Sequence, residues 1–432
     1  MFTALIAIFC VAYLFIALEE PTRVNKSAAA LIGAGLLWTV YALLVGEPHR
    51  IDEELGESLV GTAQIAFFLL GAMTIVEVVD AHDGFTVITS RLRARTLGSL
   101  LWFVSGVTFF LSAVHDNLTT AIVMVSLVRK LLKARDDRLI FCGMIIIAAN
   151  AGGAWSPIGD VTTTMLWIGG QVTTLAIMTK LFLPSLINVA APLAIVGLRL
   201  RGRPIVRPDA EVDGGASPIP AFERNVIFAV GLGVLLMVPV FKGITHLPPF
   251  LGILFGLGIV WLVGDLLHRN KPWREKERVT IAHALTRIDM GAITFFVGIL
   301  LAVATLEHAG ILASLADALN AAIGRLDVIV LAFGAASAVI DNVPMVAAAM
   351  GMYPLSAHPT DSFLWEFMAY CAGTGGSMLI IGSAAGVAAM GIEKINFLWY
   401  LRRFTLLALL GYLAGAAGYI LQQEVIAHAP LT

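Results

Sequence analysis

The sequence predicts an all-α polytopic membrane protein with two inverted-topology repeats of five transmembrane spans, each containing a re-entrant hairpin and a broken helix. Three observations lead to this prediction. The composition is too apolar for a soluble protein, one polar motif occurs twice inside apolar sequence, and the positive residues are segregated between the loops. Because polar groups in hydrocarbon-like sequence are costly, the duplicated motif indicates a site to which both repeats contribute.

The composition sets the broad class. Of the 432 residues 58% are hydrophobic and only 13% are charged, and the mean hydropathy is +0.87. Soluble domains carry about 25% charged residues, so the expected partner is a lipid bilayer and not a nucleic acid. Cys10, Cys142 and Cys371 lie in apolar runs, which argues against a disulfide framework or a Cys-based metal site. The N-terminal segment lacks a basic region and a cleavage site, so we expect a retained span.

The first repeat is expected to occupy residues 1–200, because runs of about 20 apolar residues mark its spans. The expected elements are scaffold spans in 1–80 (near 2–18, 27–46 and 59–80), an amphipathic stretch over 82–97, a hairpin over 100–128, a broken helix over 139–169 and a span near 182–199. The hairpin block carries polar residues at its midpoint, which favours two half-depth helices with a tip near the bilayer centre.

The second repeat is expected to occupy residues 225–432 in the same order. Residues 201–224, rich in Pro, Gly and charge, are expected to form a cytoplasmic linker. The expected elements are scaffold spans in 225–306 (near 225–242, 248–266 and 289–306), an amphipathic stretch ending at Arg325, a hairpin over 328–352, a broken helix over 364–391 and a span near 404–421.

The duplicated motif is an Asp-Asn pair at the centre of each hairpin. AVHDNLTTAIVM is matched by AVIDNVPMVAAAM, so that Asp116-Asn117 corresponds to Asp341-Asn342 about 225 positions later. Paired glycines follow each copy, in ANAGGAWSPIGDVTTTM and AGTGGSMLIIGSAAGVAAM. Glycine permits unwinding and close backbone approach, which predicts that the helix after each hairpin is broken there.

The charge distribution supports the inverted arrangement. Five spans per repeat is an odd number, so the second repeat must have the opposite orientation. If both flanks of the first hairpin are cytoplasmic, most of the 28 Lys and Arg residues lie inside, whereas the flanks of the second hairpin contain only Arg325. This topology predicts a multi-pass protein of the cell inner (plasma) membrane with both termini on the outer, periplasmic side.

The polar residues at the tips and breaks suit a cation site. Hairpin tips leave backbone groups without helical partners, which is tolerated where they line a cavity or bind a ligand. Asp116 and Asp341 supply carboxylate oxygens, and Asn117 and Asn342 supply amide groups. Oxygen-rich sites suit hard cations. A desolvated carboxylate favours a proton while a nearby cation favours its ionisation, so the two compete. That competition is a minimal mechanism for cation/proton exchange.

The two DN hairpins and the segment NAGGAWSPIGDVTTTMLW resemble the NhaD family of sodium/proton antiporters, in the ion transporter superfamily that also contains dicarboxylate, citrate and arsenite carriers. The resemblance covers nearly the whole chain. It implies exchange of Na+ or Li+ for H+, with no cofactor beyond these ions, and a transport part that moves against a homodimeric scaffold. The implied cation ligands or proton carriers are Asp116, Asn150, Asp160, Thr162, Thr163 and Asp341, with Na+ bound at Asp116, Asn150, Asp160 and Asp341.

The second half departs from this pattern, because Ser383 stands where the first half has Asp160. The first half is therefore expected to supply most of the charge. The second half is expected to contribute Asp341, Asn342, Thr374, Ser377 and Ser383.

Other interpretations stay open from the residues alone. Asp116, Asp341 and Asp160 each precede a helix and could serve only as N-caps. An anion carrier of the same fold would attract its substrate to helix N-termini, but the carboxylates would repel it. An intramembrane aspartyl protease would use Asp116 and Asp160 as a pair sharing a proton, which leaves the duplication unexplained. A passive channel fits poorly with inverted halves and broken helices. We therefore expect a transporter and not an enzyme.

Overall fold

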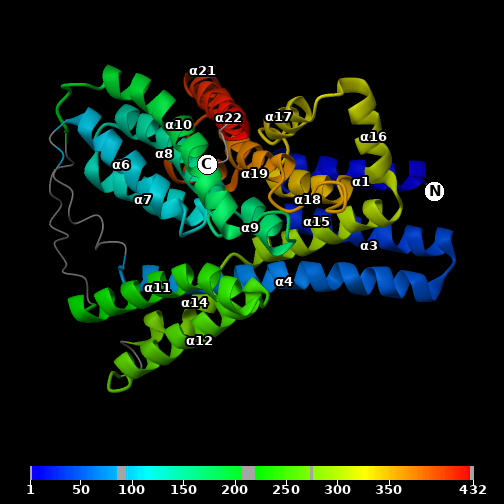
Figure 1. Cartoon of the computed structure of the whole chain (residues 1–432). Coiled ribbons are helices and arrows are strands. Elements are labelled where there is room, and N and C mark those ends of the chain that lie inside the picture. The colour runs from blue at the N-terminus through cyan, green and yellow to red at the C-terminus, as the bar shows by residue number, and fades with distance from the viewer. Residues whose placement is uncertain (1, 85–93, 95, 207–218, 273–275, 429–432) are drawn as a thin grey trace. The chain divides into compact units, whose positions relative to one another are not determined.

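The computed structural model describes residues 2–84, 94, 96–206, 219–272 and 276–428. These residues form helices joined by short connections (Figure 1), and the isolated bridge between Thr96 and Pro204 is the only extended pairing among them.

Eight of the described helices are long and apolar enough to cross a membrane. They are α3 (Lys26–Val45), α4 (Pro48–Ala81), α8 (Arg135–Ala154), α10 (Thr174–Arg199), α11 (Ala221–Thr245), α12 (Pro249–His268), α15 (Met290–His308) and α22 (Thr405–His428). The number is nine if α16 (Ile311–Ile323) and α17 (Leu326–Ala336) form one span. The predicted class, an all-α polytopic membrane protein, is confirmed.

The helices differ from the predicted elements mainly at their ends. The predicted span near 59–80 is the later part of α4, which begins at Pro48, a residue favoured in the first helical turn. The predicted first span is α1 (Phe2–Ala17), whose 16 residues extend about 24 Å, less than the roughly 30 Å of a bilayer core. Parts of the predicted amphipathic stretch 82–97 and linker 201–224 lie outside the described residues.

The chain folds as two compact units, and each takes segments from both halves of the sequence. Unit 1 comprises Met1–Val87, Ser217–Ala322 and Ala347–Pro354. Unit 2 comprises Ile88–Ala216, Ile323–Val346 and Leu355–Thr432. All the described hairpin tips and helix breaks fall in unit 2, and the early spans of both halves fall in unit 1.

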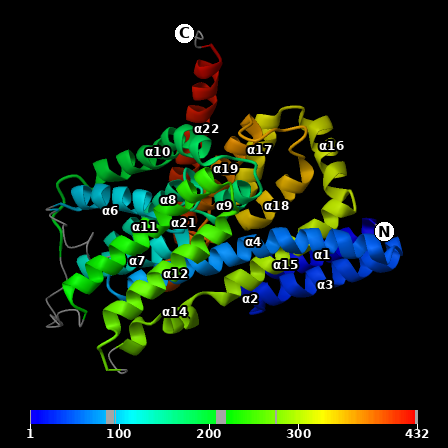
Figure 2. The same cartoon turned by 60° about the horizontal axis from the view of Figure 1, so that its bottom comes forward.

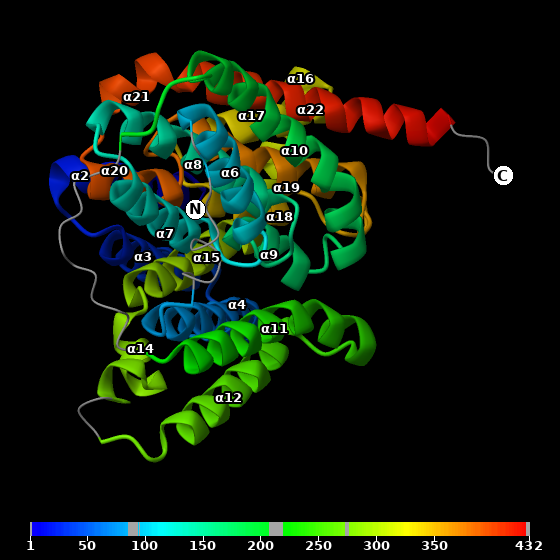
Figure 3. The same ribbon diagram turned by 90° about the vertical axis from the view of Figure 1, so that its left-hand side faces the viewer.

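Unit 1 is a helical bundle in which α1, α3, α4 and α15 run alongside one another (Figure 2). Two side chains of α3 tie it to the backbone of α15: the Ser27 hydroxyl donates to the Gly291 carbonyl at 2.7 Å, and the Trp38 indole N–H donates to the Leu301 carbonyl at 2.9 Å. The antiparallel pair α11 and α12 packs beside α4 (Figure 3). Shorter helices complete the unit, namely α2 (Glu19–Thr22), η1 (Glu277–Val279), α14 (Ile281–Arg287) and α16.

Unit 2 contains the hairpins and the broken helices. From the first half it takes the hairpin α6 (Leu97–Ser112) and α7 (Asn117–Leu131), the broken helix α8 and α9 (Val161–Ile168), and α10. From the second half it takes α17, the start of α18 (Asn342–Met352), the broken helix α19 (Phe363–Gly375), η2 (Gly376–Met378) and α20 (Ala384–Glu393), then α21 (Phe397–Arg403) and α22. Helices α8 and α19 are buried along almost their whole length and form the core.

Glycines allow the core helices to touch the hairpins, and they do so at matching positions in both halves. A Cβ atom on Gly152 would clash with the carbonyl oxygen of Phe109, and a Cβ atom on Gly375 would clash with that of Gly334. At the breaks the same holds for Gly153 against Gly159 and for Gly376 against Gly382. The paired glycines noticed in the sequence are therefore sites of backbone contact.

A buried ion pair ties α10, α19 and α22 together within unit 2. The Lys180 ammonium lies 2.5 Å from a carboxylate oxygen of Glu366, whose side chain is fully buried. The Tyr419 hydroxyl and the Gln423 amide donate to the other oxygen of Glu366 at 2.7 and 3.2 Å. Through these three donors the carboxylate of α19 is bonded to both α10 and α22.

The glycine contact yields a first prediction. Replacing Gly375 with Ala places a methyl group against the Gly334 carbonyl, which should destabilise the protein by roughly 1–3 kcal/mol through overpacking. Gly391→Ala is the matched control, because nothing lies within 4 Å of its added Cβ. Thermal unfolding in detergent, followed by tryptophan fluorescence, should show a lowered midpoint for Gly375→Ala only. Equal midpoints for the two variants would contradict the contact.

The ion pair yields a second prediction. Lys180→Met leaves the Glu366 carboxylate buried without a cation, so it should destabilise by about 3 kcal/mol. Adding Glu366→Gln removes that charge and should recover a large part of the loss. Lys130→Met, at an exposed lysine, should leave the unfolding midpoint unchanged. A double variant no more stable than Lys180→Met would show that the pair does not act as described.

Candidate functional site

The candidate site lies inside unit 2, where the tips of both hairpins meet the breaks of both broken helices. The chain leaves helical geometry between α6 and α7, between α8 and α9, and between η2 and α20. At each of these points a polar side chain begins the next helix: Asp116 for α7, Asp160 for α9 and Ser383 for α20. The sequence pattern therefore concentrates polar groups where the backbone needs capping.

Asp160 is the centre of the site. Its side chain is only 3% exposed, and one carboxylate oxygen accepts the backbone N–H of Thr162 at 3.2 Å. The other oxygen accepts from the amide of Asn117 at 3.2 Å and from the amide of Asn342 at 3.5 Å. All three donors are neutral. Buried carboxylates are normally paired with a positive charge or a metal ion. We therefore expect the Asp160 carboxylate to hold either a proton or a cation.

Asn150 connects the first half of the sequence to the second. It is fully buried in α8, and its amide oxygen accepts from the Asn117 amide at 3.0 Å. Its amide nitrogen donates to the hydroxyls of Ser377 and Ser383, at 2.9 Å each. Both N–H groups of Asn150 are thereby used, so its orientation is fixed by partners from the other half.

Asp116 and Asp341 take up helix-capping positions. Asp116 accepts the backbone N–H and the hydroxyl of Thr119, both at 2.8 Å, and Asp341 accepts the backbone N–H of Val343 at 3.2 Å. Asp116 caps α7 and Asp160 caps α9, and Asp160 in addition accepts the amides of Asn117 and Asn342, so capping is not its only contact. A carboxylate has about four acceptor sites, so capping leaves room for a further ligand. Asp116 and Asp341 each precede an asparagine whose amide donates to Asp160, which places all three carboxylates in the same region of unit 2.

The predicted hydroxyl groups divide into two sets. Ser377 and Ser383 accept from Asn150 and so belong to the site. Thr163 donates to the Asp160 carbonyl at 2.9 Å, and Thr374 donates to the Tyr370 carbonyl at 2.7 Å. These two hydroxyls bond to the backbone of their own segments, whereas Thr162 is held beside the Asp160 carboxylate by its N–H.

One connected hydrogen-bond network thus joins six predicted residues. Its members are Asn117, Asn150, Asp160, Asn342, Ser377 and Ser383. All of them lie in unit 2, although three come from each half of the sequence. The donor set is one carboxylate with amide and hydroxyl groups, a combination that suits a hard cation such as Na+.

The sequence analysis did not single out Glu366 and Lys180, which make the buried ion pair of unit 2. Charged residues within apolar stretches, here FLWEFMAY and IMTKLFL, are a recognised signal for functional or structural polar sites. Glu366 precedes Thr374 by eight residues on α19, about 12 Å along the helix. It therefore supports the helix that carries the second-half part of the site.

Comparison with known proteins identifies the family of this chain. Residues 13–373 match the model of a family described as Citrate transporter. The chain is 47% identical to sodium/proton antiporter 1 of Arabidopsis thaliana, over 99% of this chain and 74% of that protein. It is 45% identical to sodium/proton antiporter 2 of the same plant, over 96% of this chain and 98% of that protein.

A bacterial relative matches the family indicated by the motifs. The chain is 31% identical to the Na(+)/H(+) antiporter NhaD of Alkalimonas amylolytica, over 96% of this chain and 89% of that protein. This chain therefore belongs to the NhaD family of membrane transporters.

Proposed function

We propose that this protein is a secondary active transporter that exchanges Na+ or Li+ for H+ by alternating access. The observation that carries the proposal is the buried carboxylate of Asp160, whose hydrogen-bond donors are all neutral. The names of the relatives, which describe sodium/proton antiporters, support the same chemistry.

The exchange step follows from competition for one carboxylate. With a proton on Asp160 the group is neutral and compatible with its buried surroundings. With the proton released, the negative charge attracts a cation, which the oxygens of Asn150 and the Ser377 and Ser383 hydroxyls can help to coordinate. Asp116 and Asp341 add negative potential that favours cation entry. Occupancy by proton and by cation is therefore mutually exclusive.

Alternating access is compatible with the division into units. The hydrogen-bond network lies within unit 2, so motion of this unit would carry the bound ion without breaking the network. Three features expected from the sequence stay predictions and belong to this proposal: the inverted orientation of the repeats, the outward termini and a homodimer formed through the scaffold.

An anion carrier is the second candidate, because the matching family model is described as Citrate transporter. The arrangement around Asp160 opposes it, since this carboxylate and the nearby Asp116 and Asp341 would repel a citrate trianion unless several cations bound first. The protease interpretation requires Asp116 to share a proton with Asp160, whereas Asp116 directs both carboxylate oxygens at Thr119.

The decisive test uses purified protein in liposomes that contain a pH-sensitive dye. Adding Na+ or Li+ to wild-type vesicles preloaded with acid should alkalinise the lumen, whereas adding K+-citrate should not. Asp160→Asn removes the charge and should reduce exchange more than tenfold, while Asp52→Asn, at an exposed carboxylate of α4, should leave it unchanged. Citrate-driven proton movement without a Na+ response would establish the anion carrier instead.

Competition for Asp160 also predicts a pH dependence. Because H+ and Na+ occupy the same carboxylate, lowering the pH should raise the apparent KM for Na+ and leave the rate at saturating Na+ nearly constant. The measurement is the initial exchange rate against Na+ concentration at several pH values, equal on both sides of the membrane. A KM independent of pH, with a maximal rate that falls as the pH falls, would show that proton and cation bind at different groups.

A further inference from the structure

A pocket with three arginines lies in unit 2, away from the Asp160 site. Its volume is about 390 Å³, and it opens between the start of α8, the end of α10 and the junction of α21 with α22. We call it the arginine pocket, because its basic lining consists of Arg199, Arg203 and Arg403; Trp399 and Phe404 are its aromatic residues. None of these residues belongs to the proposed ion-exchange site.

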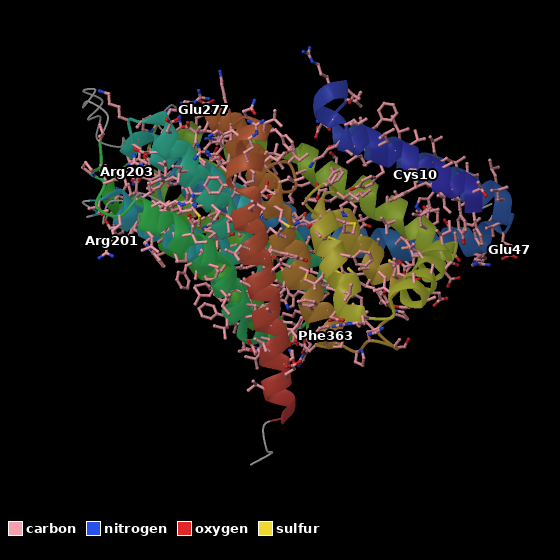
Figure 4. All side chains as sticks on the ribbon, turned by 90° about the horizontal axis from the view of Figure 1, so that it is seen from above. Cys10, Glu47, Arg201, Arg203, Glu277 and Phe363 are labelled. Atoms are coloured by element: carbon pink, nitrogen blue, oxygen red, sulfur yellow. The ribbon has the colours of Figure 1, made fainter. Side chains whose placement is uncertain are left out.

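The pocket lies where two membrane spans end. Arg199 is the last residue of α10, and Arg403 precedes the first residue of α22 by two positions. The two spans pack antiparallel, because Gly411 of α22 touches Asn188 while Gln422 donates to the Lys180 carbonyl at 3.2 Å. Figure 4 shows Arg201 and Arg203 at this end of unit 2 and Phe363 at another. The pocket is therefore at a membrane–water interface, where tryptophan is also enriched.

The charge of the pocket is net positive. Asp136 and Asp137 also line it, and Arg203 donates to Asp137 at 3.0 Å, so that one arginine is already neutralised. Arg199 and Arg403 are exposed, and neither makes a side-chain hydrogen bond or an ion pair with another residue of the described part of the chain. These two guanidinium groups offer planar forks of N–H donors, which match the oxygens of a phosphate.

The remaining wall of the pocket is apolar. Val196 and Leu200 are buried beneath the arginines, and Leu407 is half-buried beside them. Immediately outside, Leu198 and Leu406 are 68% and 74% exposed, on the surfaces of the two spans. A ligand with a phosphate and a hydrocarbon tail can satisfy both parts at once, whereas a soluble phosphate would leave the apolar surface uncovered.

We propose that the arginine pocket binds the headgroup of an anionic phospholipid, with its phosphate between Arg199 and Arg403 and its acyl chains along α10 and α22. Basic pockets between helices at a membrane surface are a recognised arrangement for acidic headgroups. The bound lipid would join the last span of each half of the sequence. The Lys180–Glu366 pair connects the same two helices through α19, but it lies nearer their other ends. The lipid would therefore connect the ends that the ion pair does not reach.

The test compares two double variants of the full-length protein with equal loss of charge. Arg199→Gln with Arg403→Gln alters the arginine pocket, and Arg201→Gln with Arg402→Gln alters neighbouring exposed arginines that do not line it. Each protein, in neutral detergent, is titrated separately with dioleoyl-phosphatidylglycerol, dioleoyl-phosphatidylcholine and inorganic phosphate. The readouts are the unfolding midpoint and the number of lipids retained in native mass spectrometry.

Phosphatidylglycerol should raise the midpoint of the wild type and of the Arg201/Arg402 variant by several degrees, and phosphatidylcholine should not. The pocket variant should lose most of that shift and retain one lipid fewer. The single variants Arg199→Gln and Arg403→Gln should each lose part of the shift, which keeps the test valid if the double variant fails to fold. Equal shifts in both double variants, or the same shift with inorganic phosphate, would overturn the proposal. Ion exchange is not measured, so the outcome is independent of the proposed function.

Discussion

The burial of the Asp160 carboxylate among neutral donors is the constraint on which the rest of unit 2 depends. An ionised carboxylate removed from water is unfavourable, and two side-chain amides and one backbone N–H supply hydrogen bonds to this one without supplying a compensating charge. Those donors must converge from three segments that are far apart in the sequence, namely the tips of both hairpins and the start of α9. The hairpins, the breaks and the tight glycine contacts are the structural means of bringing them together.

The glycines explain why the breaks can be so compact. Each broken helix carries a pair of glycines, and a Cβ atom at any of these four positions would collide with backbone of the neighbouring hairpin or of the break itself. Side chains there would push the hairpin tips away from α8 and α19, and Asn117 would lose its hydrogen bonds to Asn150 and Asp160. Backbone contact, and not side-chain packing, therefore sets the distance across which the polar network forms.

Much of this arrangement could be predicted from the sequence, because its strongest signals are local. The duplicated polar motif indicated Asp116, the family resemblance indicated Asn150 and Asp160, and the spacing of apolar residues located the spans. The pairing of Asn150 with Ser377 and Ser383 could not be predicted, because which of several neutral hydroxyls an amide meets depends on packing across more than 220 positions. The ion pair of Lys180 with Glu366 was not predicted for the same reason. The two residues are far apart in the sequence, and neither has an oppositely charged partner close by in the chain.

The two halves of the sequence differ at matched positions, and both are needed to complete the hydrogen-bond network around Asp160. Ser383 caps α20 as Asp160 caps α9, so the second half keeps the helix cap but lacks the charge. Without Asn342, Ser377 and Ser383, however, Asp160 would lose one amide donor and Asn150 would lose both acceptors for its N–H groups. Two carboxylates at these matched positions would repel each other in a dry site and require an additional cation. Replacing one of them with serine leaves a network that a single proton or a single monovalent cation can neutralise.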